Sequence, residues 1–232
     1  YLEEISIDCT EEDMDMLKGI ASTALTGKSV EESKEHLVEL ALKSILSVLK
    51  IENGKYVADV KKVKIDAWAG ESVDSSEIIN GLFIDKERVH PNMPERVENA
   101  KIALLDCDIQ LIELDMNADL SLKDPQMLEN FHNRESQNLK SMIDKIIYSG
   151  ANVLFCQQGI DDRALAFLTS AEIFSLRRLR RYDIDWIAEA TGAQLLISLD
   201  DLTEDTLGSA GLVEEVKVHE FGMCFVREPK NK

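Results

Sequence analysis

The stretch that decides the fold is residues 151–199, which read ANVLFCQQGIDDRALAFLTSAEIFSLRRLRRYDIDWIAEATGAQLLISL. Short apolar runs in this stretch are residues 153–156, 173–176 and 195–197. They predict buried strands, and the segments that begin near Asp161 and Asp183 between them predict helices. Strands that alternate with helices are typical of a parallel or mixed sheet with covering helices, so this region predicts an α/β fold.

The segments that flank this region extend the same pattern. Asp124-Pro125 predicts the start of a long helix and Ser149-Gly150 its end, because proline favours the first helical position and glycine ends helices. Further strands are predicted at residues 81–84, 102–105, 110–114, 213–218 and 223–226. Gly208-Ser209-Ala210-Gly211 is too short for a dinucleotide-binding fingerprint, and we interpret it as a loop.

The N-terminal part is predicted to be mainly helical. Thr10, which precedes three acidic residues, predicts an N-cap, and Ser29 with Glu32 predicts a capping box for a second helix. Residues 57–65 alternate in part and predict a strand. The small, polar stretch 70–76 that follows predicts a domain boundary.

The composition excludes several classes of protein. The 232 residues are 44% hydrophobic, with 26 Lys and Arg against 44 Asp and Glu, which gives a net charge of −18. Such a chain is expected to fold and to repel phosphate backbones and anionic lipids, so neither nucleic acid nor a membrane is an expected partner. The four cysteines are widely separated, which predicts reduced thiols and a cytoplasmic location. Because the chain starts without Met, we expect an internal fragment of a larger protein.

Gly27-Lys28-Ser29 resembles the end of a phosphate-binding P-loop. The first glycine of that motif is replaced by Ser22, and the preceding segment looks helical rather than like a buried strand. A nucleotide-binding α/β enzyme that uses this turn therefore remains the alternative function.

Two charged clusters have a functional and a structural interpretation. Asp161-Asp162 could serve acid–base chemistry or Mg²⁺, but its place at a helix start favours N-capping. The basic run from Arg177 to Arg181 could bind nucleic acid, but local ion pairing is favoured in so acidic a chain. The histidines are scattered and no nucleophile motif is present, so no catalytic residue and no metal site are predicted.

Several stretches together resemble one family. They read IDKERVHPNMP at residues 84–94, KIALLD at 101–106, GANV at 150–153, QGIDD at 158–162, RR at 177–178, ATGA at 190–193 and DLT at 201–203. In order and over nearly the whole chain, they resemble the group II chaperonins, which are the archaeal thermosome and its eukaryotic cytosolic relatives.

The resemblance implies a domain division. Residues 1–71 resemble the N-terminal segment of the intermediate domain, which is small and mainly helical. Residues 72–226 resemble the apical domain, an α/β domain with a β-sheet core, flanking helices and a helical protrusion at 117–140. Residues 227–232 would start the return to the intermediate domain.

The resemblance also implies a function. The parent protein would be a chaperone, an ATP-driven double ring that binds and encapsulates non-native polypeptides, with sibling subunits as partners. ATP and Mg²⁺ would be its cofactors. The family's equatorial domain and catalytic Asp are missing from this sequence, so the fragment itself is expected to hold no cofactor and to be no enzyme.

Three sets of site residues follow from the resemblance. The nucleotide-sensing loop of the parent would be Thr26, Gly27 and Lys28. Client binding would involve Leu165, Ala166, Phe167, Tyr182, Trp186 and Glu189. The lid protrusion would carry an apolar cluster of Met127, Leu128 and Phe131, which either contacts neighbouring subunits and clients or packs locally.

For Trp186, the spacing of apolar residues along the predicted helix gives a separate prediction, which concerns the exposure of its side chain. Buried positions at i, i+3, i+4 and i+7 are predicted at Ile184, Ile187, Ala188 and Thr191. Trp186 lies on the opposite side, so it is predicted to be exposed. Related subunits often have Lys at this position and Gln-His-Tyr where this chain has Leu165-Ala166-Phe167, which leads to the hypothesis of a more apolar client-binding wall.

Overall fold

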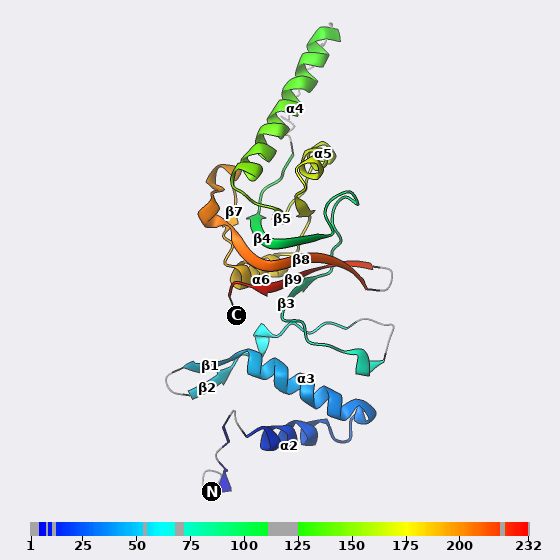
Figure 1. Ribbon diagram of the computed structural model, residues 1–232, viewed down its shortest axis with the longest axis vertical. Coiled ribbons are helices and arrows are strands. Elements are labelled where there is room, and N and C mark those ends of the chain that lie inside the picture. Colours follow the sequence, from blue (N-terminus) through cyan, green and yellow to red (C-terminus); the bar gives the residue numbers. More distant parts are fainter. Residues whose placement is uncertain are drawn as a thin grey trace, which may run out of the picture. The chain divides into compact units, whose positions relative to one another are not determined.

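The computed structural model describes residues 5–7, 9–10, 13–52, 55–67, 72–110, 125–218 and 221–231. Side chains are not described at residues 52, 55, 125–133, 135, 218 and 221. The chain divides into two compact units, Tyr1–Ile78 and Ile79–Lys232, which are described separately (Figure 1). Within the described residues, no helix is both long and apolar enough to span a membrane.

In the described residues of the first unit, the main elements are the helices α2 and α3 and a hairpin. Its elements are α2 (Met14–Leu25), the 3₁₀ turn η1 (Glu31–Ser33), α3 (Lys34–Ser47), β1 (Leu49–Glu52), β2 (Lys55–Ala58) and the 3₁₀ turns η2 (Val60–Lys62) and η3 (Val73–Ser75). Strands β1 and β2 pair antiparallel, and α2 packs against α3. The expected mainly helical character is therefore confirmed, with a hairpin added to it.

Three local predictions for this unit are wrong. Thr10 does not cap a helix, because its amide and hydroxyl both donate to the Asp13 carboxylate and α2 starts at Met14. The second helix begins at Lys34 after a 3₁₀ turn, so the capping box predicted from Ser29 is absent. The strand predicted at 57–65 ends at Ala58, because the Asp59 carboxylate accepts a hydrogen bond from the Lys61 amide and closes a turn.

The second unit is built on a mixed sheet. Its strands are β3 (Gly81–Ile84), β4 (Arg96–Leu105), β5 (Val153–Cys156), β6 (Phe174–Leu176), β7 (Leu195–Leu196), β8 (Gly208–Val218) and β9 (Phe221–Pro229). The described strands have the order β3-β9-β8-β4-β5-β6, and β7 pairs with β4 beyond the end of β8. Pairing is antiparallel from β3 to β4 and parallel among β4, β5, β6 and β7. The predicted α/β fold is confirmed.

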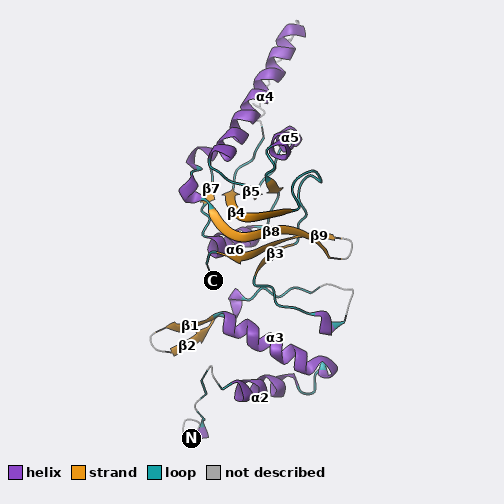
Figure 2. Ribbon diagram, in the orientation of Figure 1, coloured by secondary structure: helices purple, strands orange, loops and turns teal. Residues whose placement is uncertain are grey.

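Helices cover both faces of this sheet (Figure 2). They are α4 (Pro125–Tyr148), α5 (Asp162–Ser170) and α6 (Arg181–Thr191). Successive side chains of a strand point to opposite faces, so Ile102 and Leu104 join the cluster under α6, whereas Ala103 and Leu105 join the cluster under α4 and α5. Because both faces are covered there, β5 and the second half of β4 from Ile102 to Leu105 are apolar and buried throughout.

The strands and the long helix largely agree with the predictions for this unit. The apolar runs at 81–84, 102–105, 153–156, 173–176 and 195–197 all contain strands, and α4 starts at the predicted proline. Of the predicted strand 110–114, all but the first residue lies outside the described residues. Residues 227–229, placed by the resemblance at the start of the intermediate domain, continue β9.

The loop predicted at residues 208–211 is instead the start of β8. Gly208 shows the reason. A Cβ atom there would lie 2.5 Å from Thr191 Oγ1 and 2.7 Å from Ala193 Cβ. Glycine at this position therefore allows the strand to approach the end of α6 closely, and it does not mark a turn.

Candidate functional site

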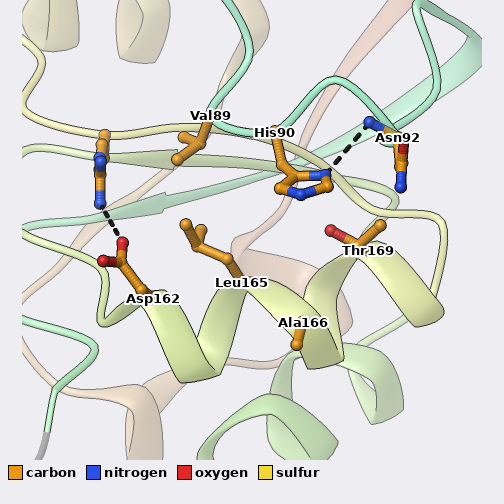
Figure 3. A pocket seen from close by; sticks show the side chains of 8 residues that line it. Val89, His90, Asn92, Asp162, Leu165, Ala166 and Thr169 are labelled. Carbon is orange, nitrogen blue, oxygen red and sulfur yellow. Dashed lines mark hydrogen bonds and ion pairs between the residues drawn. The ribbon is translucent and has the colours of Figure 1, made fainter.

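An open pocket of about 480 Å³ lies between α5 and the loop that joins β3 to β4 (Figure 3). We call it the α5 pocket. Its lining residues are Val89, His90, Asn92, Asp162, Leu165, Ala166, Thr169 and Arg177. Two of the predicted client-binding residues, Leu165 and Ala166, line it, so this is where the structure gathers part of the predicted site.

Helix α5 is held at its N-terminus by Asp161. The Asp161 carboxylate accepts a hydrogen bond from the Arg163 amide at 2.8 Å, which confirms the N-cap interpretation. The hydrogen bond from the Arg163 side chain also holds the pKa of Asp161 below its ordinary value. Asp162 is exposed and pairs with Arg177 Nη1 at 3.2 Å. This ion pair lies at one end of the pocket.

The opposite wall of the pocket is a loop anchored to the sheet. Arg88 pairs with the Glu215 carboxylate at 3.4 Å, and their side chains are only 11% and 9% exposed. Arg88 Nη1 also donates to the Met93 carbonyl at 3.1 Å. The Val89 amide donates to the Ser175 carbonyl in β6 at 3.0 Å, which covers the edge of the sheet. The loop wall is therefore fixed before any ligand binds.

The remaining polar groups of the lining lie at the end of the α5 pocket opposite the Asp162–Arg177 ion pair. The Asn92 amide donates to His90 Nδ1 at 3.1 Å, so the proton of a neutral His90 ring is on Nε2. The Thr169 hydroxyl lies on the side of His90 (Figure 3), is closed to solvent and has no hydrogen-bond partner among the described residues. Such a buried, unpaired hydroxyl destabilises the protein.

The other predicted client-binding residues do not line this pocket. Phe167 is half-buried against the cluster under α4 and α5. On α6, Tyr182 is 47% exposed and Glu189 is exposed. Of the six residues, Leu165 and Ala166 therefore line the α5 pocket, Tyr182 and Glu189 lie on the surface of α6, and Phe167 and Trp186 pack against the core.

The prediction that Trp186 is exposed is wrong. Its side chain is half-buried and packs against the apolar cluster under α6. Helical spacing gave the correct buried stripe, including Ile184 and Ile187, but a large ring at the edge of such a stripe can fold back onto the core. The hypothesis of a more apolar wall loses its support from Trp186.

The basic run is engaged locally, as predicted. Arg181 Nη1 lies 3.3 Å from the Asp106 carboxylate, and its Nε lies 3.3 Å from that of Asp185. Arg177 pairs with Asp162, and Leu179 in the middle of the run is buried. These contacts favour ion pairing over nucleic-acid binding.

The turn at Thr26-Gly27-Lys28 follows helix α2, unlike a P-loop, which follows a strand. The Thr26 hydroxyl donates to the Ser22 carbonyl and accepts from Lys34 Nζ. Gly27 has a φ of 75°, which glycine tolerates. Lys28 is exposed.

The residues predicted for the lid protrusion, Met127, Leu128 and Phe131, lie within α4, but their side chains are outside those described. The C-terminal half of α4 packs on the sheet through Leu139, Ile143 and Ile146, and its other half extends away from the sheet in Figure 1.

The four thiols are free, as predicted. Burial raises the pKa of Cys156 to about 12, and its Sγ donates to the Cys107 carbonyl. A thiol that stays protonated is a poor nucleophile. Among the described side chains, no three His, Cys, Asp or Glu residues gather as a metal site.

Comparison with known proteins identifies the family to which this chain belongs. The chain belongs to the TCP-1/cpn60 chaperonin family, which it matches over residues 1–232. It is similar to the thermosome subunit of Methanopyrus kandleri, with 44% identity over 99% of this chain and 43% of that protein. It is also similar to the thermosome subunit beta of Archaeoglobus fulgidus, with 42% identity over 99% of this chain and 42% of that one.

A solved structure agrees with these relatives. The open-state monomer of a group II chaperonin from Methanococcoides burtonii matches with a TM-score of 0.79 and 40% identity, over 100% of this chain and 52% of that chain. The predicted resemblance to group II chaperonins is confirmed. The chain spans less than half the length of the two thermosome subunits.

Most residues of the α5 pocket were not predicted as site residues from the sequence. Val89, His90 and Asn92 lie in a motif quoted for the family resemblance alone, and Asp162 and Thr169 share the helix face of Leu165 and Ala166 by spacing. That spacing was a usable signal. The pairing of this face with a loop about 75 residues earlier is a long-range contact, for which a single sequence gives no signal.

Proposed function

We propose that this chain supplies the client-binding part of a chaperonin, an ATP-driven double ring that binds and encapsulates non-native polypeptides. In this proposal residues 72–226 act as the apical domain and residues 1–71 as the N-terminal segment of the intermediate domain. The partners are unfolded polypeptides and sibling subunits, in the cytoplasm.

The observation that carries the proposal is family membership over the whole chain together with an open pocket at a predicted client-binding helix. A surface that binds many sequences needs apolar area with polar groups at its margin. Leu165 and Ala166 supply the former, and Tyr182 and Glu189 on α6 would add an exposed amphipathic margin.

The other two sets of residues have roles that depend on parts of the subunit outside this sequence. Thr26, Gly27 and Lys28 would sense the nucleotide, and Met127, Leu128 and Phe131 would form the tip of the built-in lid. ATP and Mg²⁺ would be held elsewhere in the whole protein. We propose that the 232-residue chain alone neither binds nor hydrolyses ATP.

Suppression of aggregation tests the proposal. A heat-unfolded model protein is incubated with the chain, with and without ATP, and light scattering is followed. We expect scattering to fall in proportion to the chain added, equally in both conditions. Unchanged scattering at a large molar excess of chain would contradict the proposed function.

A further inference from the structure

We propose that Cys107 and Cys156 form a redox site, in which a peroxide oxidises the two thiols to a disulfide that ties the end of β4 to the end of β5. This inference goes beyond the proposed function and does not depend on it. Neither cysteine lines the α5 pocket.

The two cysteines lie at the ends of neighbouring parallel strands. Cys156 is the last residue of β5, and its partner across the sheet, Leu105, is the last residue of β4. Cys107 follows two residues later. The Cys156 Sγ donates to the Cys107 carbonyl oxygen at 3.2 Å, so the buried thiol already points toward the backbone of Cys107. Both side chains contact the same apolar cluster under α4 and α5.

The backbone around Cys107 is held in place on both sides. Before it, the Asp106 carboxylate accepts from Gln158 Nε2 at 2.9 Å. After it, the Asp108 carboxylate accepts from the Gly159 amide, also at 2.9 Å. These contacts fix Cys107 against the segment that continues from Cys156. Two groups that are held close react with each other far faster than the same groups free in solution.

The oxidation balances as two thiols and one hydrogen peroxide giving one disulfide and two waters. The thiolate of Cys107, which is partly exposed, attacks one peroxide oxygen and becomes a sulfenic acid as the O–O bond breaks and the first water leaves. The Cys156 thiol then attacks that sulfur, and an S–S bond forms while the S–O bond breaks. The hydroxyl group leaves with the thiol proton as the second water. The two thiols lose two electrons, which the peroxide accepts.

Burial keeps this pair reduced until an oxidant is in excess. Desolvation raises the pKa of the Cys107 thiol, and the carboxylates of Asp108 and Asp106 raise it further. A smaller fraction of thiolate slows the attack on peroxide. We therefore expect the disulfide to form slowly and to need a large excess of peroxide.

The test is peptide mapping of the 232-residue chain with Cys9→Ser, which removes the exposed thiol. The folded chain is treated with hydrogen peroxide, its remaining thiols are alkylated in denaturant, and its peptides are mapped by mass spectrometry without reduction. We expect a linked pair of peptides that joins Cys107 to Cys156, and we expect dithiothreitol to separate the pair. Cys224 should be the only cysteine that is still alkylated.

The other buried cysteine is the matched control. Cys224 lies in β9 and belongs to the cluster under α6, on the opposite face of the sheet from Cys156. Cys224→Ala should therefore leave the linked peptides unchanged. Cys156→Ala should abolish them and leave Cys107 as a sulfenic acid, which dimedone traps.

The disulfide should also raise the melting temperature of the chain. It joins residues 49 positions apart and closes a loop that contains all of α4, so it restricts the unfolded chain. We expect a rise of about 5 °C or more after oxidation, and no rise for Cys156→Ala treated in the same way. An unchanged or lower melting temperature in a chain whose disulfide has been mapped would show that the native fold does not fit the bond, and would overturn the inference.

Two further results would contradict the redox site. Linked peptides that appear only when peroxide is added in urea would show that the folded chain does not bring the sulfur atoms together. A lasting Cys107 sulfenic acid in the chain that keeps Cys156 would show the same. Aggregation suppression enters none of these measurements, so failure of this inference and failure of the proposed function are distinguishable.

Discussion

The two units differ in how completely their apolar side chains are buried. In the second unit, strand residues are completely buried on both faces of the sheet, such as Ile102 and Phe155 in the cluster under α6 and Leu154 in the cluster under α4 and α5. In the first unit, Val38 is the one buried residue among those described, and Ile20 and Ile65 are 60% and 83% exposed. The second unit is thus stabilised by its own core, whereas the first leaves apolar surface open to contact with other protein surfaces.

The largest expected effect is in the core of the second unit. Phe155→Ala should lower the free energy of unfolding by about 3 to 5 kcal/mol, because it removes a fully buried ring and leaves a cavity. Val38→Ala should cost about 1 kcal/mol, since its surroundings can relax. Urea titration followed by circular dichroism measures both. Equal losses for the two variants would remove the contrast between the units.

The second largest loss of stability is expected at Arg88, which anchors the loop that forms one wall of the α5 pocket. Arg88→Met should cost about 3 kcal/mol, because Glu215 would stay buried without its cation. Glu95→Gln removes the exposed partner of the same guanidinium and should cost less than about 1 kcal/mol. Thermal unfolding of both variants checks this difference. A larger loss for Glu95→Gln would show that the exposed pair, and not the buried one, holds the loop.

The cap of α5 should have a smaller effect that depends on pH. Asp161→Ala should cost about 1 kcal/mol at neutral pH. The pKa of Asp161 lies below its ordinary value of 3.8 in the folded chain, so its ionised form stabilises the fold above that pH. The stability difference between the unchanged chain and the variant should shrink as the pH falls below 3.8. Urea titrations between pH 3 and pH 7 measure this stability difference. A difference that grows toward low pH would contradict the predicted direction of the pH dependence.

The smallest expected effect is at Lys28. Calorimetric titration of the chain with ATP and Mg²⁺ should give no binding heat, and Lys28→Ala should leave the melting temperature unchanged, because Lys28 is exposed in an open turn. Saturable binding that Lys28→Ala abolishes would favour the nucleotide-binding alternative and give the first unit a function of its own.

Sequence was informative where a pattern repeats locally. The buried strand at Val153 and the proline that starts α4 follow from composition and position within a few residues. The Asp161 cap was also predictable, because an acidic residue before a helix has few other roles.

The predictions were wrong where a contact with a residue far away in the sequence determines the local structure or the burial of a side chain. Gly208 suggested a turn, yet it lies in a strand because Thr191 and Ala193 approach it. Trp186 was predicted on the exposed side of its helix, yet its ring reaches the core cluster. The α5 pocket needs Val89 opposite Leu165, and only the folded chain brings them together.

The central claim is that the second unit, rather than the exposed apolar surface of the first, binds non-native polypeptide. Hydrogen–deuterium exchange of the chain, with and without an excess of a permanently unfolded protein, tests it most directly. We predict slower exchange in α5, α6 and the loop at residues 89–92, with α2 and α3 unchanged. Slower exchange in α2 and α3, with α5 and α6 unaffected, would contradict the account.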